Sequence, residues 1–112
     1  MREAIEAPSP GLVRMALEEL IRMGPETRRS ADKRLAERIP KDNAQLRAAA
    51  LAEAERAVKT AESLAREYVD GARTQDAAES ELRRQFAWLA DPALGDDLTN
   101  RLGNYGFFLA IK

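Results

Sequence analysis

The stretch at residues 42–71, DNAQLRAAALAEAERAVKTAESLAREYVDG, decides the fold class of this chain. Its apolar residues recur at spacings of three and four, so in a helix they lie on one broad face. They are Leu46, Ala50, Leu51, Ala54, Ala57, Val58, Ala61, Leu64, Ala65, Tyr68 and Val69. The opposite face is charged and places Glu55 before Lys59, and Glu62 before Arg66, in the favourable i,i+4 order. The sequence therefore predicts a long amphipathic helix with one solvated face.

Polar residues and a glycine mark the ends of this helix. Asp42 and Asn43 are good N-terminal caps, because their side chains accept hydrogen bonds from free backbone N–H groups. Gly71 breaks or bends the helix, and the pattern leaves open whether it forms a hinge or a turn. Asp76, with Glu79 three residues later, resembles a capping box and predicts the start of the next helix.

That next helix is predicted to end at Asp91-Pro92, because proline drives the residue before it out of the helical region. Its apolar positions are Leu82, Phe86 and Leu89, with Trp88 to the side. Asp96 is then the predicted cap of a last helix. The apolar repeat of that last helix consists of Leu98, Leu102, Tyr105 and Leu109.

Small residues predict a close helix crossing in the C-terminal part. Gly103 and Gly106 each lower helix propensity by about 1 kcal/mol relative to alanine, and the close approach of another helix commonly compensates for such a loss. A seam of small residues on the long helix, at Ala54, Ala57 and Ala61, permits the same approach.

Two shorter helices are predicted before the long one. The first begins at Ser9-Pro10, where the serine caps and the proline occupies the first helical position, and it ends at Gly24-Pro25. Its apolar residues are Leu12, Val13, Ala16, Leu17, Leu20 and Ile21. The second runs from about residue 26 or 27 to 39 and ends before Pro40. Its narrow apolar stripe consists of Ala31, Leu35 and Ile39.

These elements predict an all-α fold. Three valines and four isoleucines in the whole chain are too few for the β-branched enrichment of strands. Short connections favour antiparallel neighbours, so we expect a compact array or up-down bundle of four to five helices with no strands. Residues 1–8 are expected to form a flexible N-terminal lead-in, and residues 9–112 a single helical domain.

The absence of histidine and cysteine excludes most catalytic chemistry. It removes Ser-His and Cys-His pairs, imidazole bases and ordinary zinc sites, and no glycine-rich phosphate loop is present. Asp91, Asp96 and Asp97 cluster around one connection, but helix capping accounts for them better than a metal site. We therefore expect no enzyme, cofactor or small-molecule substrate. An enzyme that uses carboxylates and a hard cation remains a third hypothesis.

Charge and hydropathy indicate the compartment. The net charge is −1, the N-terminus lacks the pattern of a secretory leader, and no apolar run approaches the length of a membrane span. The sequence therefore predicts a soluble cytoplasmic protein that does not bind membranes. The richness in Ala, Arg, Glu and Leu is typical of bacterial or phage sequences.

The C-terminal segment concentrates aromatic and branched side chains beside two glycines. These side chains either fill the core or contact another molecule, because a helix that is apolar on more than one face is central to its bundle or docked on a partner. The leading hypothesis is a non-enzymatic protein-protein interaction module: a small subunit, adaptor or inhibitor that contacts a partner protein or a second copy. The candidate interface residues are Trp88, Tyr105, Phe107, Phe108 and Ile111.

A basic segment at residues 28–47 gives an alternative hypothesis. Seven basic residues stand against four acidic ones between Glu26 and Arg47, and guanidinium groups suit phosphate. This pattern is compatible with an accessory subunit that binds a nucleic-acid backbone without sequence preference. The candidate phosphate-binding residues are Arg28, Arg29, Arg34, Arg38 and Lys41. The competing interpretation is a solvated helix face that its own acids, Asp32, Glu37 and Asp42, neutralise.

Overall fold

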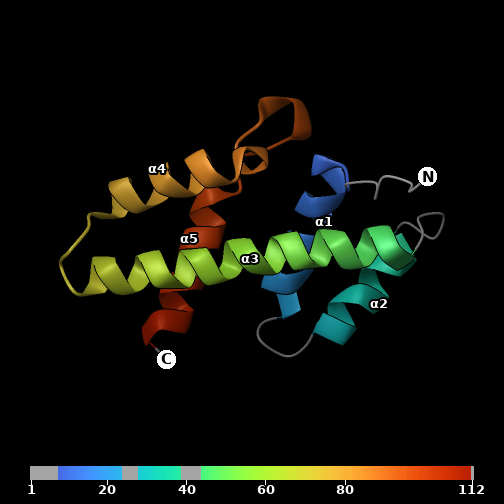
Figure 1. Cartoon of the computed structure of the whole chain (residues 1–112), viewed down its shortest axis with the longest axis horizontal. Coiled ribbons are helices and arrows are strands. Elements are labelled where there is room, and N and C mark those ends of the chain that lie inside the picture. Colours follow the sequence, from blue (N-terminus) through green and yellow to red (C-terminus); the bar gives the residue numbers. More distant parts are fainter. Residues whose placement is uncertain (1–7, 24–27, 39–43, 112) are drawn as a thin grey trace, which may run out of the picture. The chain divides into compact units, whose positions relative to one another are not determined.

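The computed structural model describes residues 8–23, 28–38 and 44–111. Its α-helices are α1 (Pro10–Met23), α2 (Arg28–Arg38), α3 (Ala44–Val69), α4 (Gln75–Gln85) and α5 (Thr99–Ile111), and its short 3-10 helices are η2 (Ala87–Leu89) and η3 (Pro92–Leu94) (Figure 1). These described ranges contain no strand, which confirms the all-α prediction. None of the helices in them combines the length and apolar content needed to cross a membrane.

The chain divides into two compact units, Met1–Ala54 and Glu55–Lys112, and each is described by itself. The prediction of a single domain at residues 9–112 stays a prediction.

The first unit contains α1, α2 and the first part of α3. Ser9 begins α1 as predicted, because its Oγ accepts a hydrogen bond from the Leu12 N–H at 3.1 Å and its carbonyl accepts one from the Val13 N–H at 3.1 Å. Helix α1 packs against α2. The buried apolar residues of these two helices are Leu12, Val13, Ala16, Leu17, Leu20, Ala31 and Leu35.

Several predicted boundaries of the first unit lie outside the described residues. They are the stops at Gly24-Pro25 and Pro40, the stripe residue Ile39, and the caps Asp42 and Asn43. The helices on either side have the predicted order and type.

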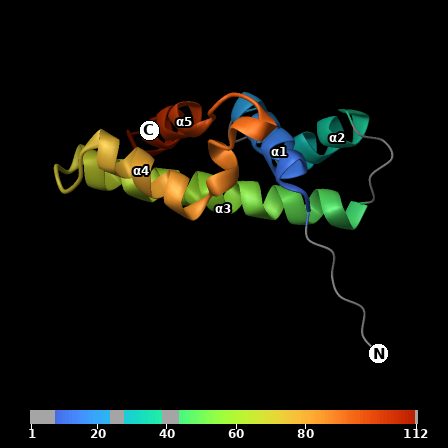
Figure 2. The same ribbon diagram turned by 90° about the horizontal axis from the view of Figure 1, so that it is seen from above.

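The second unit begins on the long helix α3 and turns sharply at Gly71. The Ala72 N–H donates to the Glu67 carbonyl at 2.8 Å, and the Gly71 N–H donates to the Tyr68 carbonyl at 3.1 Å. With Gly71 at φ +82°, these two bonds form a Schellman motif. Gly71 therefore forms a turn, and α4 runs back beside the second half of α3 in both views (Figures 1 and 2).

Helix α4 begins earlier than the sequence predicts. Its N-cap is Thr74, whose hydroxyl accepts a hydrogen bond from the Ala77 N–H at 3.1 Å. The predicted capping box of Asp76 and Glu79 is therefore wrong. The tight turn at Gly71 leaves so few connecting residues that Thr74 is the residue next to the free N–H groups of the helix. Asp76 therefore lies within the first helical turn.

Helix α4 also ends earlier than predicted, at Gln85 instead of Asp91. Phe86 leaves the helical region, with φ −129° and ψ 75°, and the chain continues as the short helix η2. This change of direction keeps both Phe86 and Leu89 fully buried. Asp91 caps the following turn η3 by accepting a hydrogen bond from the Ala93 N–H at 2.9 Å.

Helix α5 begins at Thr99, and Asp97 binds its first backbone N–H group, while the predicted cap at Asp96 stays a prediction. Asp97 Oδ1 accepts a hydrogen bond from the Thr99 N–H at 2.8 Å. Gly95, at φ +123°, reverses the chain just before this point. The helix then crosses α3 (Figure 1).

The crossing of α5 over α3 is as close as the small residues predicted. A Cβ atom added to Gly106 would lie 2.6 Å from the carbonyl carbon of Ala61 and 2.7 Å from its oxygen. Gly103 has no such constraint, because its nearest neighbour would be Glu79 Oε2 at 3.9 Å. The predicted close approach is therefore confirmed at Gly106 alone.

Candidate protein-interaction surface

Large apolar side chains are exposed where α3 and α5 end. The exposed fractions are 37% for Tyr68, 50% for Val69, 39% for Phe107, 52% for Phe108 and 55% for Ile111. The rings of Tyr68 and Phe107 contact each other, with centroids 6.0 Å apart. We call these five residues the aromatic patch.

The periodicity of α5 explains why part of the patch faces outward. Leu102 and Gly106 are buried on one face, together with Leu98 and Thr99 just before them. With 3.6 residues per turn, Phe107, Phe108 and Ile111 emerge on the far side of the helix from Leu102. Helix α5 is therefore apolar on two opposite faces, and only one of them is covered within the second unit.

A hollow of about 200 Å³ lies beside the aromatic patch. Its apolar lining includes Ala61, Leu64 and Ala65 of α3 and Ala78 and Leu82 of α4. Tyr68 and Phe107 belong to both the hollow and the patch. Pockets for small organic ligands commonly measure about 300–1,000 Å³, so this volume suits a single inserted side chain better.

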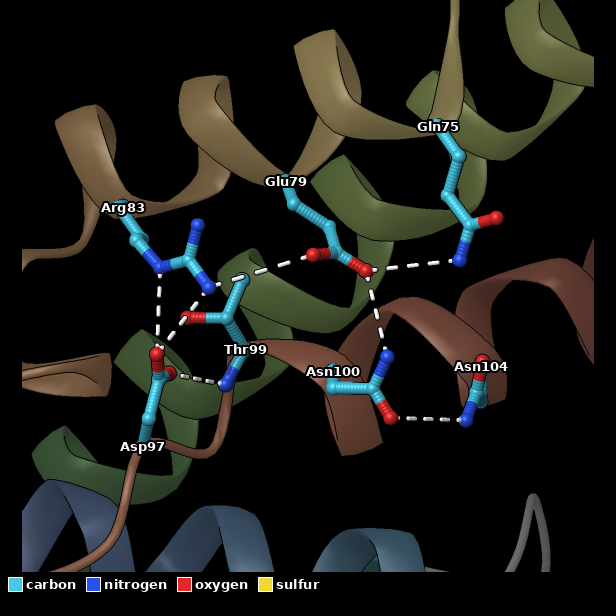
Figure 3. A network of polar contacts seen from close by, with 7 residues as sticks. All are labelled: Gln75, Glu79, Arg83, Asp97, Thr99, Asn100 and Asn104. Carbon is cyan, nitrogen blue, oxygen red and sulfur yellow. Dashed lines mark hydrogen bonds and ion pairs between the residues drawn. The ribbon is translucent and has the colours of Figure 1, made fainter.

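Polar contacts connect α4 to the start of α5, and two of the residues involved, Gln75 and Glu79, also line the hollow (Figure 3). Glu79 Oε2 accepts hydrogen bonds from Asn100 Nδ2 at 3.3 Å and from Gln75 Nε2 at 3.5 Å. Arg83 lies 3.9 Å from Glu79 and donates to Asp97 from both Nε and Nη2, at 3.2 and 3.1 Å. We call these contacts the polar seam, and they hold in place the helix that carries the patch.

Hydrogen bonding from Thr99 lowers the pKa of Asp97 first, and the Arg83 guanidinium of the polar seam lowers it further. A lowered pKa means that Asp97 stabilises the fold at a pH above its ordinary pKa, and this stabilisation is lost as the pH falls through the folded-state pKa. We expect Arg83→Gln to raise the pKa of Asp97 part of the way to its ordinary value, as read from carboxyl-carbon NMR titration.

Arg84→Gln provides the matched control, because Arg84 pairs with Glu81 one turn away. The pKa of Glu81 lies at about 2, mainly because of hydrogen bonding from Arg84 and then Gln85. The control variant should raise the pKa of Glu81 and leave that of Asp97 unchanged. Equal responses of Asp97 to both variants would contradict the pairing of Arg83 with Asp97.

The remaining predicted interface residues are partly buried. Tyr105 stacks on Phe108, with ring centroids 6.4 Å apart, and so supports the patch from its edge. Trp88 packs edge-on against the buried ring of Phe86 at 5.8 Å, and Arg56 lies over the same Phe86 ring at 4.9 Å. Trp88 therefore belongs to the packing around Phe86.

Sequence reasoning missed two members of the patch, Tyr68 and Val69. Their spacing assigns them to the apolar face of α3, but they lie in its last turn, just before Gly71. Their position at the end of the helix is the feature of the sequence that indicates exposure.

The predicted phosphate-binding residues are only partly described. Lys41 lies outside the described residues, and the side chains of Arg28 and Arg29 are not described. Arg34 is exposed. Arg38 forms ion pairs with Glu19 at 3.1 Å and with Glu18 at 3.4 Å, both on α1.

The acidic residues near the start of α5 act as caps and ion-pair partners. Asp91 and Asp97 each accept a backbone hydrogen bond, and Asp97 also binds Arg83. Within residues 8–23, 28–38 and 44–111, no three side chains of the metal-binding types come together.

Comparisons with known proteins identify no relative of this chain. No model of a known protein family matches it, and searches of curated proteins and of solved structures find no significant match.

Proposed function

We propose that this chain is a protein-interaction module without catalytic activity, a small subunit, adaptor or inhibitor that docks through the aromatic patch. The observation that carries the proposal is the exposure of Phe107, Phe108 and Ile111 on the face of α5 that the second unit leaves uncovered. Contiguous exposed apolar side chains mark interaction sites, and aromatic residues are enriched at the centres of interfaces.

The scarcity of charge on α5 supports the same proposal. A third of all residues in the chain are charged, yet Arg101 is the one charged residue between Thr99 and Ile111. The centres of protein interfaces are depleted in charged residues, because a buried charge without a partner is costly. The composition of α5 is therefore that of an interface helix.

The size of the patch defines its role within an interface. A fully covered aromatic side chain buries roughly 150–250 Å², so the three aromatic members of the patch, Tyr68, Phe107 and Phe108, expose roughly 250 Å² together, and Val69 and Ile111 add to this area. One side of a standard interface buries about 800 Å². The patch therefore supplies the apolar centre of the contact, and polar residues around it supply the rim.

Photo-crosslinking tests this proposal. A benzoylphenylalanine at position 108, in an extract of the cells that produce the protein, is expected to give a discrete adduct. The same probe at Lys59, an exposed residue on the polar face of α3, is the matched control and should give none. Excess wild-type chain should compete for the adduct, whereas excess Phe108→Asp chain should not.

The absence of an adduct at position 108, or identical adducts at both positions, would refute the proposal. Circular dichroism must show the helicity of the wild type for every labelled and competing variant, because an unfolded competitor would be uninformative. If Phe108→Asp fails this check, Ile111→Asp takes its place.

Nucleic-acid binding by the basic segment is the weaker hypothesis. Arg38 is held by two carboxylates of α1, which reduces the positive charge available to a phosphate. Arg34 is the described basic candidate outside these ion pairs. This alternative stays a prediction.

A further inference from the structure

We infer that the hollow formed by α3, α4 and α5 binds a phenol ring, a single aromatic ring whose hydroxyl donates a hydrogen bond. The residues that line the hollow all belong to the second unit. Binding there does not depend on the docking proposed above, because Phe108, from which that proposal is tested, does not line the hollow.

The volume of the hollow sets the size of its ligand. An engineered apolar cavity of about 150 Å³ binds one benzene molecule, whereas sites for larger organic ligands begin at about 300 Å³. The hollow, at about 200 Å³, lies between these two values. It therefore has room for one ring with a small substituent, which is the size of an aromatic side chain.

The buried part of the lining is apolar, and aromatic rings stand beside it. The rings of Tyr68 and Phe107 have centroids 6.0 Å apart and planes tilted by 57°. Aromatic rings attract one another in tilted and offset arrangements, so a third ring gains more here than an aliphatic group of the same size. The buried lining residues are Ala61, Leu64, Ala65, Ala78 and Leu82.

The polar part of the lining offers hydrogen-bond acceptors. Glu79 Oε2 already accepts hydrogen bonds from Asn100 and Gln75 (Figure 3). The other oxygen, Glu79 Oε1, lies 3.9 Å from Arg83 Nη2, which is beyond hydrogen-bond distance, so it can accept a bond from a ligand. Asn104 donates to Asn100 through Nδ2, and its Oδ1 keeps its capacity to accept. A ligand that donates a hydrogen bond is therefore favoured.

Charge distinguishes a phenol from other compounds with one ring. Glu79 is the one charged residue among the described residues that line the hollow, and 16% of its side chain is exposed. Its carboxylate accepts a strong hydrogen bond from a hydroxyl but repels an anionic substituent, such as that of benzoate. Arg83 lies outside the lining and donates two hydrogen bonds to Asp97, so it is engaged elsewhere.

NMR titration of the whole chain with phenol, and separately with benzoate, provides the test. Phenol should shift the backbone amide signals of lining residues such as Ala78 and Gly103 until they saturate. A Kd on the order of millimolar is expected, because the ligand has few atoms. Benzoate should bind at least about 10-fold more weakly. Phe108→Asp should bind phenol as the wild type does.

Two leucine variants locate the site. Gly103→Leu should abolish phenol binding, because the new side chain fills the hollow, and its Cβ meets no atom closer than 3.9 Å. Ala77→Leu places the same side chain at an exposed position of α4 outside the lining and should leave binding unchanged. Should Gly103→Leu lose helicity, Glu79→Gln replaces it. This variant keeps the shape of the hollow, and phenol should bind about fivefold more weakly to it.

A further titration with N-acetyltyrosinamide identifies the source of the ring. Binding at least as tight as that of phenol indicates a tyrosine side chain of a docked protein, whereas weaker binding indicates a free small phenol, and either result supports the site. The absence of saturable shifts with phenol, equal binding of benzoate, or phenol binding that survives in Gly103→Leu overturns the site. The crosslinking result at position 108 is independent of all these outcomes, so either proposal can fail while the other stands.

Discussion

Replacing Gly106 with alanine is expected to destabilise the protein by about 2 kcal/mol, although the same change in a helix is normally favourable. Alanine improves helix propensity by about 1 kcal/mol, but overpacking a close contact costs about 1–3 kcal/mol or more. The added Cβ would lie 2.6 Å from the Ala61 carbonyl carbon. Because that atom belongs to the backbone, no side-chain rotation relieves the clash, and α5 must move away from α3.

Gly103→Ala is the matched control for this prediction, since both glycines lie in α5. A Cβ at Gly103 meets no atom closer than 3.9 Å, so the variant should gain up to about 1 kcal/mol from helix propensity. Thermal unfolding followed by circular dichroism should show melting temperatures that move in opposite directions, with a decrease of about 10 °C for Gly106→Ala. Stabilisation by both substitutions would disprove the close crossing.

Truncating Phe86 to alanine is expected to cost about 3–5 kcal/mol, the usual range for a fully buried aromatic side chain. The ring touches Trp88 edge-on and lies beneath the Arg56 guanidinium, so both contacts are lost together with its burial. Urea unfolding in dilute solution measures the change. A large fall in the denaturation midpoint, or a failure to fold, is expected.

Phe108→Ala removes the same atoms from the surface and serves as the control. Half of the Phe108 side chain is exposed, so its truncation should lower the free energy of unfolding of the monomer by only about 1 kcal/mol, well below the loss at Phe86. A loss as large as that of Phe86→Ala would place Phe108 in the core. The proposed interaction surface would then lose its centre.

The fold class was predictable because helix periodicity and helix-breaking residues are local. The start of α1 at Ser9 and the end of α3 at Gly71 depend on neighbouring residues, and the sequence shows them directly. The errors occur where several polar residues compete for the same backbone groups. Thr74 prevails over Asp76 as the N-cap of α4 because of the geometry of the preceding turn, which residue type does not specify.

The candidate surface was predictable in part. The outward orientation of Phe107, Phe108 and Ile111 follows from the period of α5 once Leu102 is assigned to the core. The membership of Tyr68 in the aromatic patch depends on its ring contact with Phe107, and these two residues are far apart in the chain. The ion pairs of Arg38 with α1 are likewise long-range contacts that spacing alone does not reveal.

The crossing at Gly106 also limits how this protein can evolve. The atoms that exclude a side chain there include the carbonyl carbon and oxygen of Ala61, which any amino acid at position 61 would also carry. No compensating mutation at Ala61 can therefore make room at position 106, whereas Gly103 is free to drift. Distant descendants that keep this crossing should retain a glycine at that position long after the rest of the sequence has diverged, which makes Gly106 a marker for recognising them.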